Sequence, residues 1–294
     1  MQLEDRKTIE RAKGVLMTAR GLSEDEAFTL LRSTAMHVNL RLPELARGVI
    51  EAARWAEAVN RSGQLRMLSQ RLVKLLAQRL ADVDPRGARR LQDEAAVRVQ
   101  DTLAYLRELA RATPEAPAWA PALEQVTQAW EALREALEQR LGAASLRRAD
   151  ERAEALLAAA ESLTGTLEVG SQRRSLRMVN ACGRLRMVTQ RVAKQALMGA
   201  TAPAAGTSAP GVDEALLDQF ATVLVELERA PLSTPDIRAR LTAASDEWQR
   251  LLRGLRGLPR EDALAGVAHS GDQLLEMLDA LTADYEHSLQ VILS

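Results

Sequence analysis

Two segments of the chain, 120 residues apart, carry nearly the same row of polar and charged side chains. Residues 59–74 read VNRSGQLRMLSQRLVK and residues 179–194 read VNACGRLRMVTQRVAK, and nine of the sixteen positions are identical. On a helix with about 100° per residue, all of the identical positions except Leu65 fall within an arc of about 140°. The sequence therefore predicts two related helices that present the same polar face, which in the first copy consists of Val59, Asn60, Gly63, Arg66, Met67, Gln70, Arg71 and Lys74.

The arginines on these faces are suited to hold a small anion. A guanidinium is planar and always charged, and its paired donors match an oxyanion. Two guanidiniums that face each other repel unless negative charge lies between them, and a glycine one turn before each arginine allows close approach to the backbone. Amides would add hydrogen bonds and methionines an apolar wall. The predicted site for a small, singly charged, weakly hydrated anion consists of Arg66, Arg186, Gly63, Gly183, Asn60, Asn180, Gln70, Gln190, Met67 and Met187.

A duplicated bundle whose copies only pack against each other is the alternative interpretation. Such a duplication would preserve Leu, Ala and Val on the shared face. This one preserves Asn, Gly, Arg, Gln and Lys, which are costly to bury without a partner, so we favour the binding site. If the repeat only packs, Arg66→Ala is merely destabilising and no anion raises the melting temperature.

The composition indicates an all-α fold. The chain has 294 residues, of which 3% are aromatic and 27% are charged, with a net charge of −1. This length allows two domains with separate cores, and an Ala-, Leu-, Arg- and Glu-rich sequence with helical periodicity is typical of helical proteins. A net charge near zero excludes a global electrostatic attraction to nucleic acid.

Several kinds of chemistry find no support in the sequence. The single cysteine, Cys182, excludes an internal disulfide framework and suits a small buried helix position. His37, His269 and His287 have no partners at metal-ligand spacing, so we expect no metal and no cofactor. No phosphate loop, dinucleotide fingerprint or activated nucleophile is present, so we expect no enzyme. The N-terminal segment does not resemble a signal peptide and no run of 18 apolar residues occurs, which predicts a cytoplasmic protein without a membrane span.

Helical periodicity and capping signals place the elements that carry the two motifs. Ser23 and Glu26 form a capping box that opens a second helix, and Pro43 suits the first turn of a third. The third helix has no stop before DVDPRG at 82–87, so it is expected to form a rod of about 57 Å that runs through the first motif. The predicted helices cover about 3–19, 23–39, 43–80, 87–111, 118–141, 147–168 continuing through the second motif to 199, 213–229, 234–254 and 261–292.

These elements divide the chain near residue 55. We expect a three-helix module over 1–55 that the rod joins, without a flexible linker, to a helical domain over 56–294. That domain consists of two four-helix units, 56–168 and 169–294, which each begin with a copy of the motif. The tryptophans are predicted to anchor the cores; they are Trp55, Trp119, Trp130 and Trp248.

The pattern N-x-x-G-x-L-R-M-x-[ST]-Q-R resembles the motif of nitrate- and nitrite-sensing helical domains. It is similar to the sensor region of nitrate sensor kinases, to the NIT domain of nitrate-responsive antiterminators and to the sensor domain of type IV pilus chemotransducers. The resemblance implies that Arg66 and Arg186, from two helices, grip nitrate or nitrite. It also implies that Gly63 and Gly183 give close backbone contact. In architecture it covers about residues 55–290.

The N-terminal module resembles the ANTAR domain, a three-helix RNA-binding module of antitermination regulators. The resemblance is carried by Ala12, Lys13, Gly14, Leu16, Met17, Ala27, Leu31, Arg32, Ala35, Met36 and Asn39. It implies a homodimer that binds paired hairpins in leader mRNA and prevents a terminator from forming. Charge alone does not indicate RNA, because residues 1–53 contain eight Lys/Arg and eight Asp/Glu. The candidate RNA contacts, each of which suits a solvated helix face equally well, are Arg11, Lys13, Arg32, Arg41 and Arg47, with Asn39 as a possible reader of base edges.

Together these features predict a nitrate- or nitrite-responsive antitermination regulator. Anion capture between Arg66 and Arg186 would draw the motif helices together and reorient the N-terminal module for RNA through the shared rod. In nitrate-responsive antiterminators the sensor precedes the RNA module; here the order is reversed, which favours direct coupling. The alternative is an anion-sensing protein whose N-terminal helices dimerise or dock a protein partner. Salt-dependent binding to a two-hairpin RNA distinguishes the two.

Overall fold

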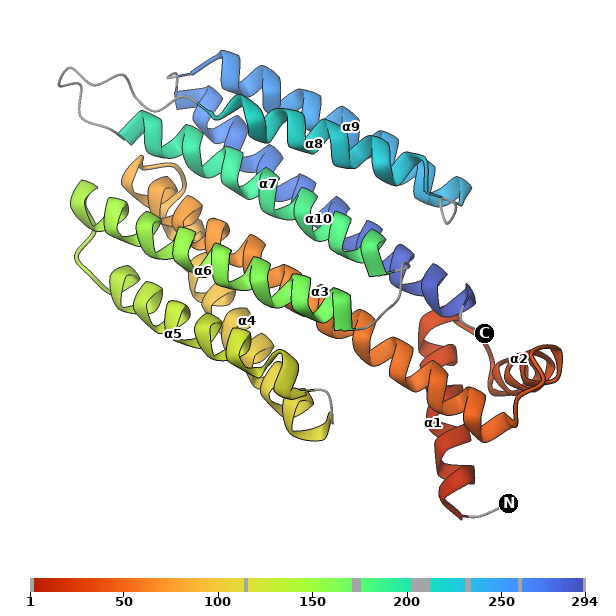
Figure 1. The fold of residues 1–294 in the computed structure, drawn as a ribbon. Helices are drawn as coiled ribbons and strands as arrows, with labels where there is room; N and C mark the ends of the chain where they lie inside the picture. The colour runs from red at the N-terminus through yellow and green to blue at the C-terminus, as the bar shows by residue number, and fades with distance from the viewer. Residues whose placement is uncertain are drawn as a thin grey trace.

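The computed structural model describes residues 3–113, 116–170, 176–201, 212–230, 234–258 and 261–292. Regular secondary structure in these ranges is entirely helical, which confirms the predicted all-α fold (Figure 1). None of the helices in these ranges has the length and apolar character needed to cross a lipid bilayer. The elements are α1 (Leu3–Arg20), α2 (Glu24–His37), α3 (Leu42–Leu80), α4 (Pro85–Ala112), the short 3-10 helix η1 (Ala116–Ala118), α5 (Ala120–Leu137), α6 (Ala143–Gly170), α7 (Leu176–Thr201), α8 (Glu214–Glu228), α9 (Pro235–Arg256) and α10 (Glu261–Ile292).

The first two helices and the first turns of α3 form a small unit with its own core. The predicted capping box at the start of α2 is present, since the Ser23 N–H donates to Glu26 Oε2 at 2.8 Å and the Glu26 N–H donates to Ser23 Oγ at 3.3 Å. Gly21 follows α1 with a φ of 61°, a left-handed conformation that favours glycine. The core side chains are Ile9, Ala12, Leu16, Ala27, Leu31, Ala35, Leu45, Ala46 and Val49.

Helix α3 is continuous from this unit into the first motif, as the sequence predicts. Its 39 residues make it about 58 Å long, and Pro43 lies in the first turn, where its missing N–H costs nothing. Helices α1 and α2 pack against its N-terminal part, and α4, α6 and α7 pack against it further on (Figure 1). The far end of the chain also reaches the N-terminal unit, because α10 contacts α1.

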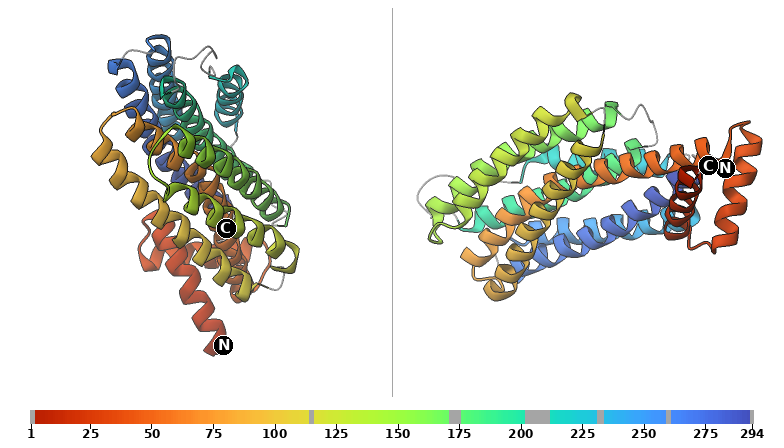
Figure 2. Two further views of the ribbon diagram at one scale, coloured as in Figure 1. Left: turned by 90° about the vertical axis from the view of Figure 1, so that its left-hand side faces the viewer. Right: turned by 90° about the horizontal axis from the view of Figure 1, so that it is seen from below.

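The remaining helices form two four-helix units, α3–α6 and α7–α10, in which successive helices alternate in direction (Figures 1 and 2). The prediction that one helix runs from 147 into the second motif is wrong. Helix α6 ends at Gly170, α7 begins at Leu176, and α7 runs back in the opposite direction; residues 171–175 lie outside the described ranges. The reversal places α7 beside α3 with the same direction, and these two motif helices share the most extensive contact in the structure.

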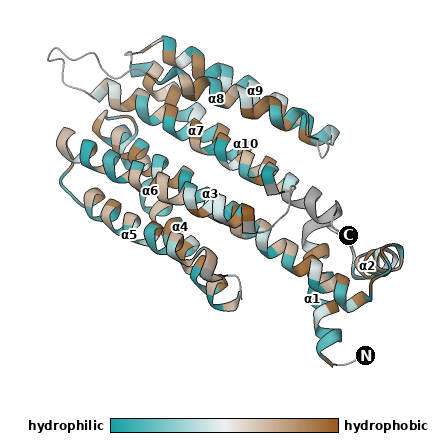
Figure 3. Cartoon of the chain, in the orientation of Figure 1, coloured by the Kyte–Doolittle hydropathy of each residue, from teal (hydrophilic) through white to brown (hydrophobic). Residues whose placement is uncertain are grey.

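Each unit has an apolar core, to which some side chains of the other unit contribute. The four tryptophans are buried, as predicted, and Trp248 stacks on Phe220 with ring centroids 3.9 Å apart. Cys182 is fully buried in the second core, which agrees with its interpretation as a small core residue. On the outer helices, hydrophobic and hydrophilic residues alternate with the helical turns (Figure 3), so one face of each packs inward.

Part of the shared polar face joins the two units by buried ion pairs. Asp272 of α10 accepts hydrogen bonds from Arg71 Nη1 at 2.5 Å and from Lys74 Nζ at 2.8 Å, both on α3. Burial alone would raise the pKa of Asp272, but the charges of Lys74 and Arg71 outweigh it and hold the pKa below its ordinary value. The second copy repeats the arrangement in the opposite sense, with Arg191 and Lys194 of α7 bound to Glu154 of α6 at 2.8 Å each, and Lys194 also to Asp150 at 2.5 Å.

The Lys74 ammonium is expected to make stability depend on pH in the sense opposite to an ordinary ion pair. It is completely buried, and burial lowers its pKa from 10.5 to about 8. Between these values the unfolded chain binds more protons than the folded protein, so the free energy of unfolding rises with pH. We expect a rise of about 2–3 kcal/mol between pH 8 and 10 relative to Lys74→Met, measured by urea unfolding. Parallel pH profiles for the two proteins would contradict this.

Candidate anion-binding site

The backbones of the two motif helices come close together at their glycines. A Cβ atom placed on Gly183 would lie 3.7 Å from the Cα of Gly63 and only 2.7 Å from Nη2 of Arg66. A Cβ on Gly63 would lie 3.1 Å from the same nitrogen. The close backbone approach predicted for these glycines therefore occurs between the helices themselves, and it makes room for an arginine side chain.

Arg66 and Arg186 meet beside this crossing, and each reaches across to the other helix. Arg66 Nη2 donates to Asn180 Oδ1 at 2.7 Å, and Arg186 Nη2 donates to Asn60 Oδ1 at 2.7 Å. Both Nη2 atoms lie within 3.7 Å of the position that a Cβ on Gly183 would take. This reciprocal pattern fits parallel helices, because helical side chains slant toward the N-terminus and so reach a partner almost two turns earlier.

Each guanidinium is also paired with a carboxylate from its own unit. Arg66 Nη1 lies 2.8 Å from Glu161 Oε2 on α6, and Arg186 Nη1 lies 2.6 Å from Asp279 Oδ1 on α10. The arginine side chains are 0% and 1% exposed, whereas those of Glu161 and Asp279 are 53% and 33% exposed. Both guanidiniums are thus buried, whereas their counter-ions are partly exposed to solvent.

One donor on each arginine is left without a partner. The Nε atoms of Arg66 and Arg186 are both buried and form no hydrogen bond, and Gln70 Oε1 is likewise unpartnered. Buried donors normally find partners because their desolvation is costly. Burial lowers the pKa of Arg66, Glu161 opposes this, and the Arg186 cation adds to the lowering. The site therefore has spare donors that an anion could use.

The acidic residues of the site belong to a second repeat, which lies outside the two motifs. Glu154 and Glu161 on α6 correspond to Asp272 and Asp279 on α10 at an offset of 118, with a spacing of seven residues in both helices. Thr164 and its counterpart also donate to the carbonyl four residues earlier at 2.7 Å in both copies. Extending the alignment beyond the motif helices would have found it, since Leu146, Leu156, Leu157, Leu163 and Thr164 are identical to Leu264, Leu274, Leu275, Leu281 and Thr282.

The other predicted ligand residues lie in different surroundings. Met67 and Met187 are buried in the apolar cores of the first and second unit. Gln190 Nε2 donates to the Gly271 carbonyl at 2.7 Å, and Gln70 Nε2 to Ser69 Oγ at 3.2 Å. The structure thus brings together the arginines, glycines and asparagines of the predicted set, while the glutamines and methionines make contacts elsewhere.

All residues predicted to contact RNA are exposed except Lys13, and three of them form ion pairs within the protein. Arg11, Arg32, Arg41, Asn39 and Arg47 are exposed. Asn39 has a φ of 54°, a conformation that asparagine tolerates better than most residues, so its place in the α2–α3 turn is itself a reason for its identity. Lys13, which is buried, forms ion pairs with Glu10 at 2.7 Å and with Glu24 at 2.6 Å. Arg41 pairs with Glu44 at 2.5 Å, and Arg47 pairs with Asp5 at 3.3 Å.

Gly183→Ala is expected to disable the arginine pair without unfolding the protein. The new methyl group would displace the flexible end of Arg66 from Asn180, because the two would otherwise be 2.7 Å apart. We expect normal helicity by circular dichroism and nitrate binding weakened about tenfold or more, the effect of one charge-assisted hydrogen bond. Gly165→Ala on α6, where nothing lies within 4 Å, is the control and should leave binding unchanged. Equal nitrate affinity in both variants would contradict this role of Gly183.

Comparisons with known proteins match two families, one to the N-terminal part of the chain and one to most of the remainder. Residues 1–50 match the ANTAR domain family, and residues 51–162 and 169–273 match the family "Type IV pili methyl-accepting chemotaxis transducer N-term". In the ANTAR region the chain is 50% identical over 48 residues to the nitrate regulatory protein of Klebsiella oxytoca. That alignment spans 16% of this chain and 12% of the relative. No solved structure matches the chain.

The second of these families accounts for more than half of the chain and covers both motifs. The chain therefore belongs to the type IV pilus methyl-accepting chemotaxis transducer N-terminal domain family, here preceded by an ANTAR domain.

Proposed function

We propose that this protein is a nitrate- or nitrite-responsive antitermination regulator, in which the helical region from residue 51 through α10 (below, the sensor domain) controls RNA binding by the ANTAR domain. The observation that carries the proposal is the buried pair of arginines from duplicated helices, each with an unpartnered Nε. The ANTAR match and the named relative support a nitrate-related regulator rather than an enzyme. As a regulator of nascent transcripts it would work in the cytoplasm, as a homodimer on paired hairpins of leader mRNA.

The charges of the site favour exchange of an anion for a carboxylate. The two arginines and two carboxylates together have no net charge. An added anion would therefore leave an excess of buried negative charge, which is costly. Glu161 and Asp279 can turn outward into water because they are partly exposed, whereas the arginines cannot. A small planar monoanion with several oxygens would then take the released donors and the spare Nε atoms.

Asp279 also lies near a second cation, which is outside the anion site. Its Oδ2 lies 3.9 Å from Arg98 Nη2 on α4, while its Oδ1 holds Arg186. Release from Arg186 would therefore shift Asp279 toward Arg98, and with it the contact of α10 on the first unit. Helices α3 and α10 both contact the N-terminal unit, so a change in their relative position reaches the ANTAR domain. The anion can shift the equilibrium between the two arrangements only by the difference in its affinity for them.

One observation favours the alternative in which the N-terminal helices dock a protein. Met36, Val38 and Leu40, around the end of α2, are 73%, 48% and 49% exposed. Exposed apolar side chains so near one another in the sequence suit a protein interface, including one between ANTAR domains. Substitution of all three by serine would abolish a protein contact but leave salt-dependent RNA binding by each domain, which separates the two functions.

Calorimetric titration of the purified protein tests the sensor. We expect saturable binding of nitrate or nitrite and none of chloride or sulfate, with affinity reduced at least tenfold in Arg66→Ala and in Arg186→Ala. Arg61→Ala, on the same helix but paired with Glu57 at the surface, should bind normally. If no anion binds the wild-type protein, the repeat only packs, and the sensing function is wrong.

Asp279→Asn tests the exchange of anion for carboxylate. Removing the negative charge that competes for Arg186 should raise nitrate affinity by about tenfold. The change in RNA affinity between nitrate-free and nitrate-saturated protein should shrink, because the counter-ion that moves is gone. Glu276→Gln, an exposed carboxylate on the same helix, is the control for a general charge effect. Weaker nitrate binding in Asp279→Asn than in this control would contradict the exchange.

A further inference from the structure

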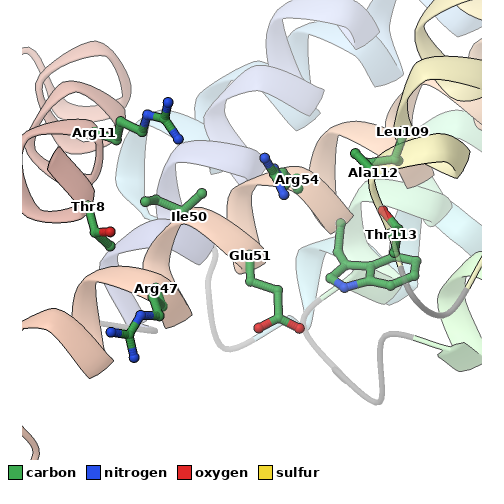
Figure 4. Close-up of a pocket in the computed structure, with 10 residues that line it drawn as sticks. Thr8, Arg11, Arg47, Ile50, Glu51, Arg54, Leu109, Ala112 and Thr113 are labelled. Atoms are coloured by element: carbon green, nitrogen blue, oxygen red, sulfur yellow. The ribbon is translucent and has the colours of Figure 1, made fainter. Parts of the chain in front are cut away.

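A cavity of about 410 Å³ lies where the ANTAR domain meets the sensor domain (Figure 4). Its walls come from α1, from the N-terminal part of α3 and from the C-terminal end of α4. The boundary between the two matched families, at residues 50 and 51, passes through it. The lining residues are Thr8, Arg11, Arg47 and Ile50 on the ANTAR side, and Glu51, Arg54, Trp55, Leu109, Ala112 and Thr113 on the sensor side.

The lining is cationic, and two of its three arginines have no counter-ion among the residues that the structure describes. Arg47, Glu51 and Arg54 lie at i, i+4 and i+7 and so share one face of α3. Arg47 pairs with Asp5 at 3.3 Å. Across the described ranges, no carboxylate lies within 4.0 Å of Arg11 or Arg54, although both line the same cavity from different helices (Figure 4). Ile50, Leu109 and the largely buried Trp55 complete an apolar floor.

We infer that this cavity is a phosphate site for RNA, and that it extends the RNA-binding surface beyond the ANTAR domain to Arg54. Guanidiniums match the oxygens of a phosphodiester, and backbone phosphates carry most of the affinity in nucleic-acid binding. This inference rests on the RNA half of the proposed function. It assigns to Arg54, outside the ANTAR match, a role that no family comparison gives it.

The exposure of the arginines distinguishes an RNA phosphate from a free one. Partly solvated cations attract an isolated ion only weakly, because water and salt screen them. A phosphate that belongs to an RNA already held by the ANTAR domain arrives at a high effective concentration, so a weak site suffices. The cavity thus suits a polyanion that also contacts exposed ANTAR residues, and Glu51 limits its affinity.

The position of the cavity gives the RNA direct contact with the sensor. An RNA phosphate in it would touch α1, α3 and the end of α4 together. Any shift of α3 relative to α4 would move Leu109, Ala112 and Thr113 relative to Arg54, and so would change the shape of the cavity and its affinity for RNA. The anion-dependent movement proposed above would then change the affinity for RNA at this cavity as well as through the orientation of the ANTAR domain.

The test uses the full-length protein and a two-hairpin RNA selected from a randomised library on the wild type. Affinity is measured over a series of salt concentrations, with and without nitrate. For Arg54→Ala we expect a five- to tenfold loss, about the worth of one charged contact, and a fall of about 1 in the salt slope. Glu51→Gln should bind more tightly. Arg147→Ala, an exposed arginine near the start of α6 at the opposite end of the bundle, is the control.

The outcomes separate this inference from the function on which it rests. If the wild type binds the RNA and Arg54→Ala behaves as Arg147→Ala does, the cavity is not part of the interface, and RNA binding by the ANTAR domain stands. If no RNA is selected in either anion condition, the RNA function itself fails, and this site with it. Inorganic phosphate is titrated in parallel. Saturable phosphate binding that Arg54→Ala abolishes, with RNA affinity unchanged, would assign the cavity to a free ion.

Discussion

Two like charges buried next to each other are the constraint on which the rest of the structure depends. Arg66 and Arg186 cannot shed their charge and have almost no contact with water. Each is held by a carboxylate from its own unit and by an amide from the other. A unit alone would leave its arginine with half of this set. The association of the units is therefore specified by polar partners, and the glycine crossing exists to let those partners meet.

This constraint also fixes the register of the motif helices. A slip of α3 along α7 would separate both arginines from their asparagines at once, and would pull Arg71 and Lys74 from Asp272. Breaking a buried ion pair typically costs 3–5 kcal/mol, so small sliding motions are resisted strongly. Movement between discrete arrangements, in which one charged partner replaces another, is the kind of change this interface permits. In the proposed sensor, such a change would reach the ANTAR domain from two sides, through α3 and α10.

Much of the fold could be predicted because its signals are local. The capping box of Ser23, the long helix after Pro43 and the buried tryptophans each follow from a few neighbouring residues. The break between α6 and α7 could not, since the residues between Gly170 and Leu176 contain no proline and continue a helical pattern. The meeting of Arg66 with Arg186 followed from an identical motif. Their partners Glu161 and Asp279 did not, because Glu and Asp differ in type and the offset changes from 120 to 118. The glutamines and methionines share the motif with the arginines, but the sequence alone does not show that they turn to other neighbours.

The duplication places both halves of the site on one polypeptide. When two identical subunits each supply one arginine, a binding site exists only where the subunits have associated, so its occupancy depends on how much protein is present. Here the chain itself keeps the halves together, and α3 and α7 face each other in every molecule. In the proposed sensor, the fraction of occupied sites would then depend on the anion and not on how many chains have associated. A cell could make more or less of such a protein without changing the anion concentration at which half of the sites are filled.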